Sequence, residues 1–518
     1  MIDVKTNKTN NSIKGSFFGV LYKLIGIICP FIIRTIIIYT LGREYIGLNS
    51  LFTSILSILS LSELGIGSAM TFNLYKPIND DNVKLIAAYM NFFKKIYRII
   101  GLVIFVSGLI LLPFINFFIE GEIPTNINIY LLYIIYLINT CISYFFFAYR
   151  TSLLNAYQRS DIVSNVASIS SLFLYITQII LLLLFNDYYI YILVLPISTI
   201  INNLLIYIFS KKLYRRIDNF NKEKLEKGLA VEVFKNTSAL FGHKVGSVLI
   251  IALPNILIST YLGLIEASIF NNYFYVITAL NSLFDIVVAA LLFSIGNYLV
   301  NHSKEEKEKL FRNLSFLLNI ITSFCSICIF CLIQDFIKVW IGTDNMYDSL
   351  IASILFSLYF YSSKFRIMGV TFKDAAGMWK NDILKPYIGI VSNLILGLIL
   401  VQSFGALGSI VSVIIVFLII YFPWETKVLY KDLFDASPKK YLSQCLIMTS
   451  ITFISSLLVK YISDYLVVNS IGMFVFKMIF VCFLSFLILV LSTFYMEGFK
   501  YCFQKILMFL KKIGRGNK

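Results

Sequence analysis

Residues 22–42 read YKLIGIICPFIIRTIIIYTLG, an apolar stretch as long as the roughly 20 residues that a helix needs to cross a bilayer. Similar stretches recur along the chain from Ser16 to Tyr495. The short connectors between them carry Lys and Arg on every second crossing. This alternation predicts a protein that crosses an inner membrane many times.

The composition of the 518 residues fits a membrane protein and makes a soluble enzyme the least favoured class. Hydrophobic residues make up 58% of the chain and the mean hydropathy is +0.83, far above the values of a soluble chain with one core. A net charge of +16 would suggest nucleic acid binding in a soluble protein. Here the cations lie in membrane connectors, as the positive-inside rule requires, so we expect no nucleic acid partner.

The lengths of the apolar runs and the turn residues between them predict an all-α polytopic membrane protein with about fourteen transmembrane helices. The predicted spans are residues 17–41, 46–74, 85–119, 127–149, 162–185, 189–210, 237–262, 267–300, 311–341, 349–372, 385–403, 406–429, 441–462 and 470–496.

The distribution of charge sets the orientation. With the N-terminus in the cytoplasm, only Arg43, Lys338 and Lys460 among the 44 cations fall on the outer side. We therefore expect both termini to be cytoplasmic. The polar start, MIDVKTNKTNNSIK, is expected to be a retained cytoplasmic tail, because no small-residue cleavage site follows the first apolar run.

An internal repeat relates two parts of the chain. Tyr22–Gly42 aligns with His243–Gly263, and Lys23 then meets Lys244 while Arg34 meets Asn255. The repeat predicts two halves with the same orientation, which is typical of transporters with a site at the midplane between the halves. The expected domains are residues 1–210 (six helices), 211–236 (cytoplasmic linker), 237–430 (six helices) and 431–518 (two further helices and a basic tail).

One face of the first span is unusually polar. Lys23, Gly26, Pro30 and Arg34 are three and four residues apart and share that face. A charge at the bilayer centre costs about 2.5–3.5 kcal/mol on insertion scales, so such a face should line protein or water. The candidate substrate-binding residues are these cations, their counterparts and the cations of the tenth span: Arg34, Lys23, Lys244, Asn255, Arg366 and Lys364. Snorkelling to the headgroups is the alternative for Lys23 and Lys244, and it is expected for Lys477.

Two acids lie inside predicted spans at nearly equivalent places, Glu63 and Asp285. Each fits a counter-ion for the cations, a proton or Na⁺ site, or a helix–helix hydrogen bond, and the sequence leaves these roles open. The C-x2-C-x2-C of Cys325, Cys328 and Cys331 has no flanking His or acid and is interpreted as packing. We expect no catalytic residue, no metal and no cofactor beyond Na⁺ or H⁺ coupling.

The segment Tyr39–Met70, YTLGREYIGLNSLFTSILSILSLSELGIGSAM, resembles the polysaccharide repeat-unit flippases of bacteria, of the O-antigen and capsule type. These belong to the multidrug/oligosaccharidyl-lipid/polysaccharide exporter superfamily. The resemblance implies a V-shaped bundle that alternates between inward-open and outward-open. It also implies transport of undecaprenyl-diphosphate-linked oligosaccharide to the outer leaflet, with cavity cations that correspond in kind to Lys23, Arg34, Lys244 and Arg366.

The expected function is therefore a flippase of the bacterial cytoplasmic membrane for surface polysaccharide synthesis, not an enzyme. The expected partners are undecaprenyl-diphosphate oligosaccharide and anionic lipids, and we expect a monomer near the polysaccharide polymerase. A cation-coupled multidrug exporter of the same fold remains an alternative, although it should concentrate acids in its cavity. A membrane glycan polymerase or O-acyltransferase is a weaker one, because the outer connectors are short and no H-E-x-x-H or G-x-S-x-G motif occurs.

Overall fold

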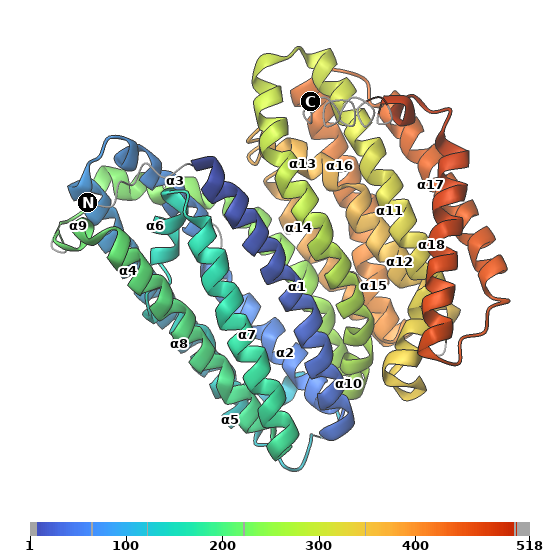
Figure 1. Cartoon of the computed structure of the whole chain (residues 1–518), viewed down its shortest axis with the longest axis horizontal. Coiled ribbons are helices and arrows are strands. Elements are labelled where there is room, and N and C mark those ends of the chain that lie inside the picture. Colours follow the sequence, from blue (N-terminus) through green and yellow to red (C-terminus); the bar gives the residue numbers. More distant parts are fainter. Residues whose placement is uncertain are drawn as a thin grey trace, which may run out of the picture. The chain divides into compact units, whose positions relative to one another are not determined.

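The computed structural model describes residues 8–63, 66–121, 123–220, 223–347, 349–501 and 504. Within these residues all regular secondary structure is helical and no strand is present, so the predicted all-α class is confirmed. The chain divides into two compact units, Met1–Ser268 and Ile269–Lys518. Figure 1 shows the helices of each unit, coloured along the chain.

The first unit is a bundle of long helices joined by short ones. Within it α1 packs on α7, α7 on α8, and α5 on both α4 and α8. Its elements are α1 (Lys8–Thr40), α2 (Glu44–Leu59), η1 (Ser60–Glu63), α3 (Ile66–Asn79), α4 (Val83–Leu111), η2 (Leu112–Phe118), α5 (Ile129–Phe145), α6 (Arg150–Ala156), α7 (Ser160–Phe185), α8 (Tyr188–Leu213), α9 (Arg215–Asp218) and the first arm of α10 (Lys227–Asn301).

The second unit begins within the second arm of α10 and has α11 at its centre, in contact with α12, α17 and α18. Its further elements are α11 (Lys304–Ile341), η3 (Thr343–Asn345), α12 (Leu350–Phe365), α13 (Ile367–Ala375), α14 (Leu384–Phe404), α15 (Ala406–Ile415), η4 (Val416–Tyr421), α16 (Phe422–Val428), η5 (Leu429–Phe434), α17 (Lys439–Ser463) and α18 (Ile471–Thr493).

Helix α10 changes direction at Gly263. This residue has φ 88° and ψ 178°, a conformation open to glycine and strained for other residues. A Cβ at this position would lie 2.8 Å from the carbonyl oxygen of Glu120. Gly263 therefore ends one predicted span and allows the next to begin.

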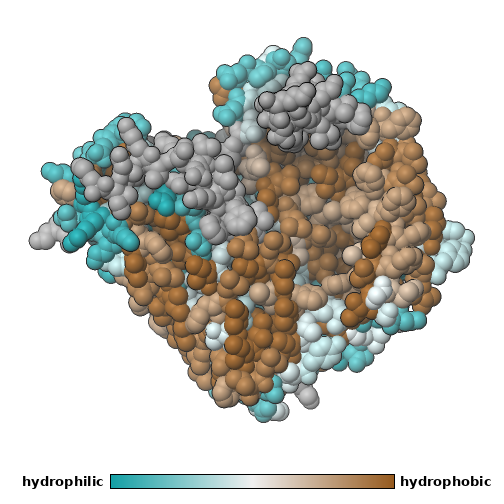
Figure 2. Space-filling model, in the orientation of Figure 1, coloured by the Kyte–Doolittle hydropathy of each residue, from teal (hydrophilic) through white to brown (hydrophobic). Residues whose placement is uncertain are grey.

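The helices are long and apolar enough for a multi-pass membrane protein. By length and composition ten helices of the described chain can cross a membrane, or eleven if the bent pair α5–α6 forms one span. The three other predicted spans correspond to the second arm of α10, to α2–η1–α3 and to α12–α13, so the total of fourteen stays a prediction. Figure 2 shows hydrophobic side chains over the middle of the helices and hydrophilic ones at their ends.

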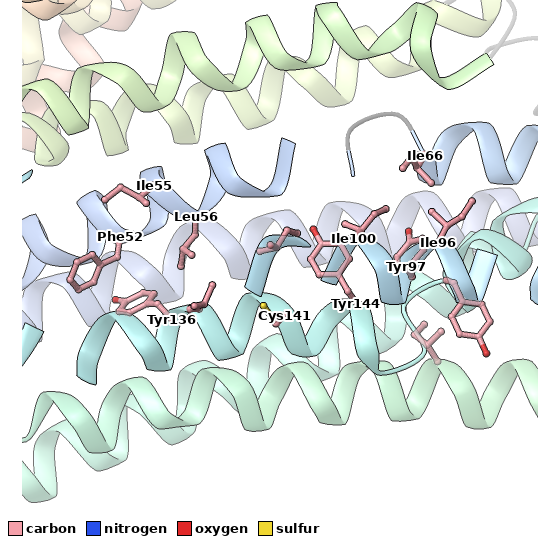
Figure 3. Close-up of a cluster of buried hydrophobic side chains, with 14 of the residues drawn as sticks. Phe52, Ile55, Leu56, Ile66, Ile96, Tyr97, Ile100, Tyr136, Cys141 and Tyr144 are labelled. Carbon is pink, nitrogen blue, oxygen red and sulfur yellow. The ribbon is translucent and has the colours of Figure 1, made fainter. Parts of the chain in front are cut away.

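Each unit has its own core. In the first unit Phe52 of α2 meets Tyr136 of α5 edge to face, with ring centroids 5.6 Å apart (Figure 3). The Tyr136 hydroxyl donates to Asn49 Oδ1 at 2.7 Å and lies 3.0 Å from the hydroxyl of Tyr188, so this polar group is satisfied inside the bundle. In the second unit Phe311 is fully buried against Phe372, Phe434 and Tyr441.

The first arm of α10 lies in the first unit. The Asn255 side chain donates to Ser54 Oγ at 3.1 Å, and the Glu120 amide donates to the Ser259 carbonyl at 2.9 Å. The compact units consequently divide after Ser268, whereas the domains predicted from the repeat divide at the 211–236 linker. The predicted six-plus-six repeat, on which that boundary rests, stays a prediction.

Candidate functional site

The polar face of the first span lies on α1, as expected from its spacing. Lys23 and Arg34 are both half-buried. A Cβ placed on Gly26, between the two cations, would meet no heavy atom within 4 Å. This face of α1 therefore combines two cations with open space.

The corresponding residues on the first arm of α10 behave differently. Lys244 is exposed, whereas Asn255 is buried and uses its amide to contact α2 through Ser54. Ile251, between them, is 51% exposed. Asn255 thus serves helix packing within the first unit, and for Lys244 both substrate binding and snorkelling stay predictions.

Lys364 lies in the last turn of α12 and Arg366 lies at the break between α12 and α13, and they reach different partners. The buried Lys364 Nζ lies 3.6 Å from Asp285 Oδ1 and 5.7 Å from the centre of the Phe284 ring. Arg366 Nη2 donates to Glu425 Oε1 at 2.8 Å. Asp285 thus lies beside a candidate cation, the arrangement expected of a counter-ion. The side chain of Glu63, the second predicted acid, lies outside the described residues.

Glu425 is the centre of a buried charge network. Its Oε1 also accepts from Lys385 Nζ at 2.6 Å, and Lys385 lies 2.9 Å from Asp382, which in turn pairs with Lys373. All four side chains are at most 5% exposed. With Arg366 the network holds three cations and two carboxylates, so its formal charge is positive.

The backbone around Glu425 explains its position. Helix α16 is a short α-helical segment between the π-helical segments η4 and η5, and Pro423 lies in its first turn. Proline cannot donate a backbone hydrogen bond, which favours the wider π turns beside it. The aromatic rings of Phe417 and Tyr421 lie 5.1 and 5.0 Å from the Arg366 guanidinium, so cation–π contacts stabilise its charge.

Sequence reasoning missed this network and one further ion pair. A signal was present, because Glu425 is an acid inside the predicted span 406–429. Lys477 was expected to snorkel outward, and this prediction is wrong. Its side chain is 4% exposed and donates to Asp335 Oδ2 at 2.8 Å, because α18 packs on α11.

The charged residues that the described chain buries are mainly basic. They comprise five cations, Arg150, Lys364, Lys373, Lys385 and Lys477, and two acids, Asp382 and Glu425. Each of the five cations has a carboxylate partner within its own unit. The partners of Arg150, Lys364 and Lys477 retain side-chain exposures of 27%, 60% and 23%. Buried positive charge is thus balanced in part by carboxylates that still contact the surroundings.

The three cysteines of the C-x2-C-x2-C lie on α11 and are free thiols. Cys328 Sγ lies 3.9 Å from Cys482 Sγ of α18. No group of three or more His, Cys, Asp or Glu in the described residues could hold a metal ion. Cys328 and Cys331 pack in a hydrophobic cluster with α17 and α18, as expected of packing residues.

Comparison with known proteins decides the family. The model of the family described as "Polysaccharide biosynthesis protein" matches residues 12–295, more than half of the chain. The chain belongs to this family. The match includes Tyr39–Met70 and confirms the resemblance to repeat-unit flippases. A search of curated proteins gives no match.

Solved structures of transporters and flippases share the fold of this polysaccharide biosynthesis family member. The lipid II flippase MurJ, inward closed, is 15% identical, with a TM-score of 0.59 over 94% of this chain and 99% of that one. An inward-facing multidrug resistance MATE family transporter of the MOP superfamily is 14% identical, with a TM-score of 0.55 over 79% and 93%. A MATE transporter of Vibrio cholerae is 12% identical, with a TM-score of 0.53 over 83% and 98%.

Proposed function

We propose that this polysaccharide biosynthesis family member is a flippase. It moves undecaprenyl-diphosphate-linked oligosaccharide repeat units from the inner to the outer leaflet of the bacterial cytoplasmic membrane by alternating access. The observation that carries the proposal is the family match over residues 12–295 in a chain whose fold matches a lipid II flippase over 94% of its length.

The chemistry of the substrate fits the cations of the chain. A diphosphate with attached sugars cannot cross about 30 Å of hydrocarbon unaided, because burial of its charge is too costly. Arg34 and Lys23 place a guanidinium and an ammonium on one face of α1, with open space at Gly26. Charge-assisted hydrogen bonds from these groups would replace the hydration that the diphosphate loses.

The pair formed by Lys364 and Asp285 suggests how the second unit takes part in substrate binding. Lys364 is buried, and its carboxylate partner is 60% exposed and 3.6 Å away. A contact of this length is looser than the hydrogen-bonded pair of Arg366 and Glu425 at 2.8 Å. We infer that a substrate phosphate exchanges with Asp285 as the partner of Lys364. The buried Arg366–Glu425–Lys385 network then remains intact as the support of the site.

The remaining parts of the proposal are the expectations from the sequence. Both termini lie in the cytoplasm, the protein acts as a monomer near the polysaccharide polymerase, and transport is coupled to Na⁺ or H⁺. Asp285 and Glu63 are the acids available as coupling sites. Anionic lipids surround the basic cytoplasmic connectors.

A multidrug exporter is the second candidate, because MATE transporters share the fold at TM-scores of 0.55 and 0.53. A cavity for cationic drugs should concentrate acids to attract its substrates. The buried charges of the described chain are instead mainly basic. This difference favours an anionic cargo.

Complementation tests the proposal. The chain is expressed in a strain of its source organism that lacks the native gene, and surface polysaccharide is measured together with susceptibility to cationic drugs. We expect restored polysaccharide and unchanged susceptibility. Restored drug resistance without polysaccharide, at normal membrane abundance of the protein, would instead identify an exporter.

A further inference from the structure

A second cationic site lies in the first unit, apart from the α1 face. A cavity of about 240 Å³ is bounded by α4, by the break between α5 and α6, and by the residues around the end of α8 and α9. Its polar and charged lining residues include Asn91, Lys94, Arg150, Lys211, Asp218 and Tyr207. Three cations and one carboxylate thus line a small, partly open cavity.

Arg150 is the buried cation of this cavity. The chain bends by 50° between α5 and α6, where Phe147 has a positive φ of 59°, and this bend brings Arg150 to the start of α6. The guanidinium pairs with Asp218, and Nη1 also donates to Ser210 Oγ at 3.3 Å. The residue is 8% exposed, and its Nε has no hydrogen-bond partner within the described chain. A buried donor left unpaired is destabilising, so a bound acceptor would be stabilised here.

The other two cations have no carboxylate partner among the described residues. Lys94 is half-buried on α4, and Lys211 lies in the last turn of α8 with Nζ 5.5 Å from the centre of the Tyr207 ring. The Arg150 guanidinium lies 5.0 Å from the same ring, which is stacked on Phe147 at 4.2 Å. Tyr207 therefore holds two cations together around the cavity, where their charges are compensated only by Asp218.

The cavity lies where the apolar surfaces of its helices end. Ile99 and Leu102, one to two turns along α4 from Lys94, are 60% and 56% exposed. Ile208 and Phe209, just before Lys211 on α8, are 48% and 41% exposed. Exposed aliphatic side chains next to cations are typical of the boundary between acyl chains and headgroups. A lipid whose chains lie on these apolar surfaces would present its phosphate to the cavity.

We infer that this cavity binds the phosphate of an anionic phospholipid headgroup. The hydrogen-bond donors come from Arg150 Nε, Lys94 and Lys211. Asp218 compensates one of the three positive charges, so the charges of the two lysines remain to attract the phosphate. Arginine and lysine together are the usual ligands of phosphate in proteins. The site is independent of the proposed transport substrate, because its residues are separate from the α1 face.

Lipid retention by a matched pair of variants tests this inference. The full chain is purified in detergent, supplied with equal amounts of phosphatidylglycerol and phosphatidylcholine, and examined by native mass spectrometry. The test variant is Lys94→Gln with Lys211→Gln. The control is Lys95→Gln with Lys212→Gln, which removes the same charge from neighbouring exposed positions outside the cavity. Both leave the Arg150–Asp218 pair untouched, and thermal unfolding verifies that they fold.

We expect the native chain and the control to retain phosphatidylglycerol at least fivefold over phosphatidylcholine, and the test variant to lose this preference. Equal loss in the folded test and control variants, or no preference in the native chain, would overturn the inference. Displacement of the lipid by millimolar inorganic phosphate, with equal phosphate binding to delipidated protein, would identify a site for a free anion and also overturn it.

Discussion

Lys364 Nζ lies 3.6 Å from Asp285 Oδ1, and only the carboxylate of this pair remains open to the surroundings, with 60% of its side chain exposed. The ammonium is buried beside the Phe284 ring. An anionic partner stabilises such a cation, but a contact of 3.6 Å to an exposed carboxylate contributes less than a fully buried pair does. The exposed position of Asp285 means that the partner can be replaced by another anion without unpacking the helices.

Neutralising each member of this pair should therefore have different consequences. Lys364→Gln removes the phosphate ligand, and we expect export to fall on the order of tenfold or more, since a hydrogen bond to a charged group contributes about 1.5–3 kcal/mol. Asp285→Asn should leave export largely intact, because the substrate replaces this carboxylate in the transport cycle. Surface polysaccharide and protein abundance are measured for both variants.

The same experiment separates a counter-ion from a coupling site. If Asp285 binds the coupling H⁺ or Na⁺, Asp285→Asn will abolish export at normal protein abundance. The inference that a substrate phosphate replaces Asp285 beside Lys364 would then be wrong. Loss of abundance in Asp285→Asn, with rescue by the added substitution Lys364→Met, would mean that the pair is structural.

Arg34 gives a second prediction, because its guanidinium stays charged at any attainable pH and can donate two parallel hydrogen bonds to a diphosphate. Arg34→Ala should insert normally and abolish export. Arg34→Lys should recover part of the activity, since it restores the charge without the bidentate geometry. Full export by Arg34→Ala at normal abundance would contradict the role of the α1 face in substrate binding.

Glu425→Gln should destabilise the second unit. The change removes the carboxylate that both Arg366 and Lys385 contact, and loss of one partner of a buried pair costs about 3–5 kcal/mol. Thermal unfolding in detergent measures the loss. Lys304→Gln is the control, because its pair with Asp435 is exposed and should contribute less than about 1 kcal/mol. Equal melting temperatures for both variants would show that the network does not stabilise the fold.

Gly47→Ala tests the packing of α10 on α2. A Cβ at Gly47 would overlap the carbonyl oxygen of Leu264 and lie 3.0 Å from its Cα, and a backbone cannot move aside as a side chain can. Overpacking of this kind typically costs about 1–3 kcal/mol, so we expect a lower melting temperature. Gly296→Ala is the control, because a Cβ there meets open space. Unchanged stability of Gly47→Ala would mean that this helix contact is looser than the structure has it.

The sequence predicted the helices well because the length and spacing of apolar runs are local properties. Each predicted span coincides with one helix, with consecutive helices or with one arm of α10. The break at Arg366 was not predicted, because no proline or glycine marks it. The close contact of Gly47 with Leu264 joins residues far apart in the chain, so apolar periodicity contains no signal for it.

The candidate site was predicted less completely, for a physical reason. A single sequence shows which spans contain charges, as it did for Arg34 and Lys364, and it does not show which charges meet. Arg366 and Glu425 are far apart in the chain, as are Lys477 and Asp335, and both pairs depend on helix packing. Snorkelling was expected for Lys477 because its partner could not be identified without the tertiary structure.

The most direct test of the central claim is lipid flipping by the purified protein. The chain is reconstituted into vesicles that contain fluorescent undecaprenyl-diphosphate-linked oligosaccharide, and a membrane-impermeant reagent measures the fraction accessible from outside. Without flipping, the reagent reaches only the labelled lipid of the outer leaflet. We predict that the native protein makes nearly all of the labelled lipid accessible, and that Arg34→Ala does not. No flipping by folded native protein, with Na⁺ or H⁺ gradients of either direction imposed, would contradict the account.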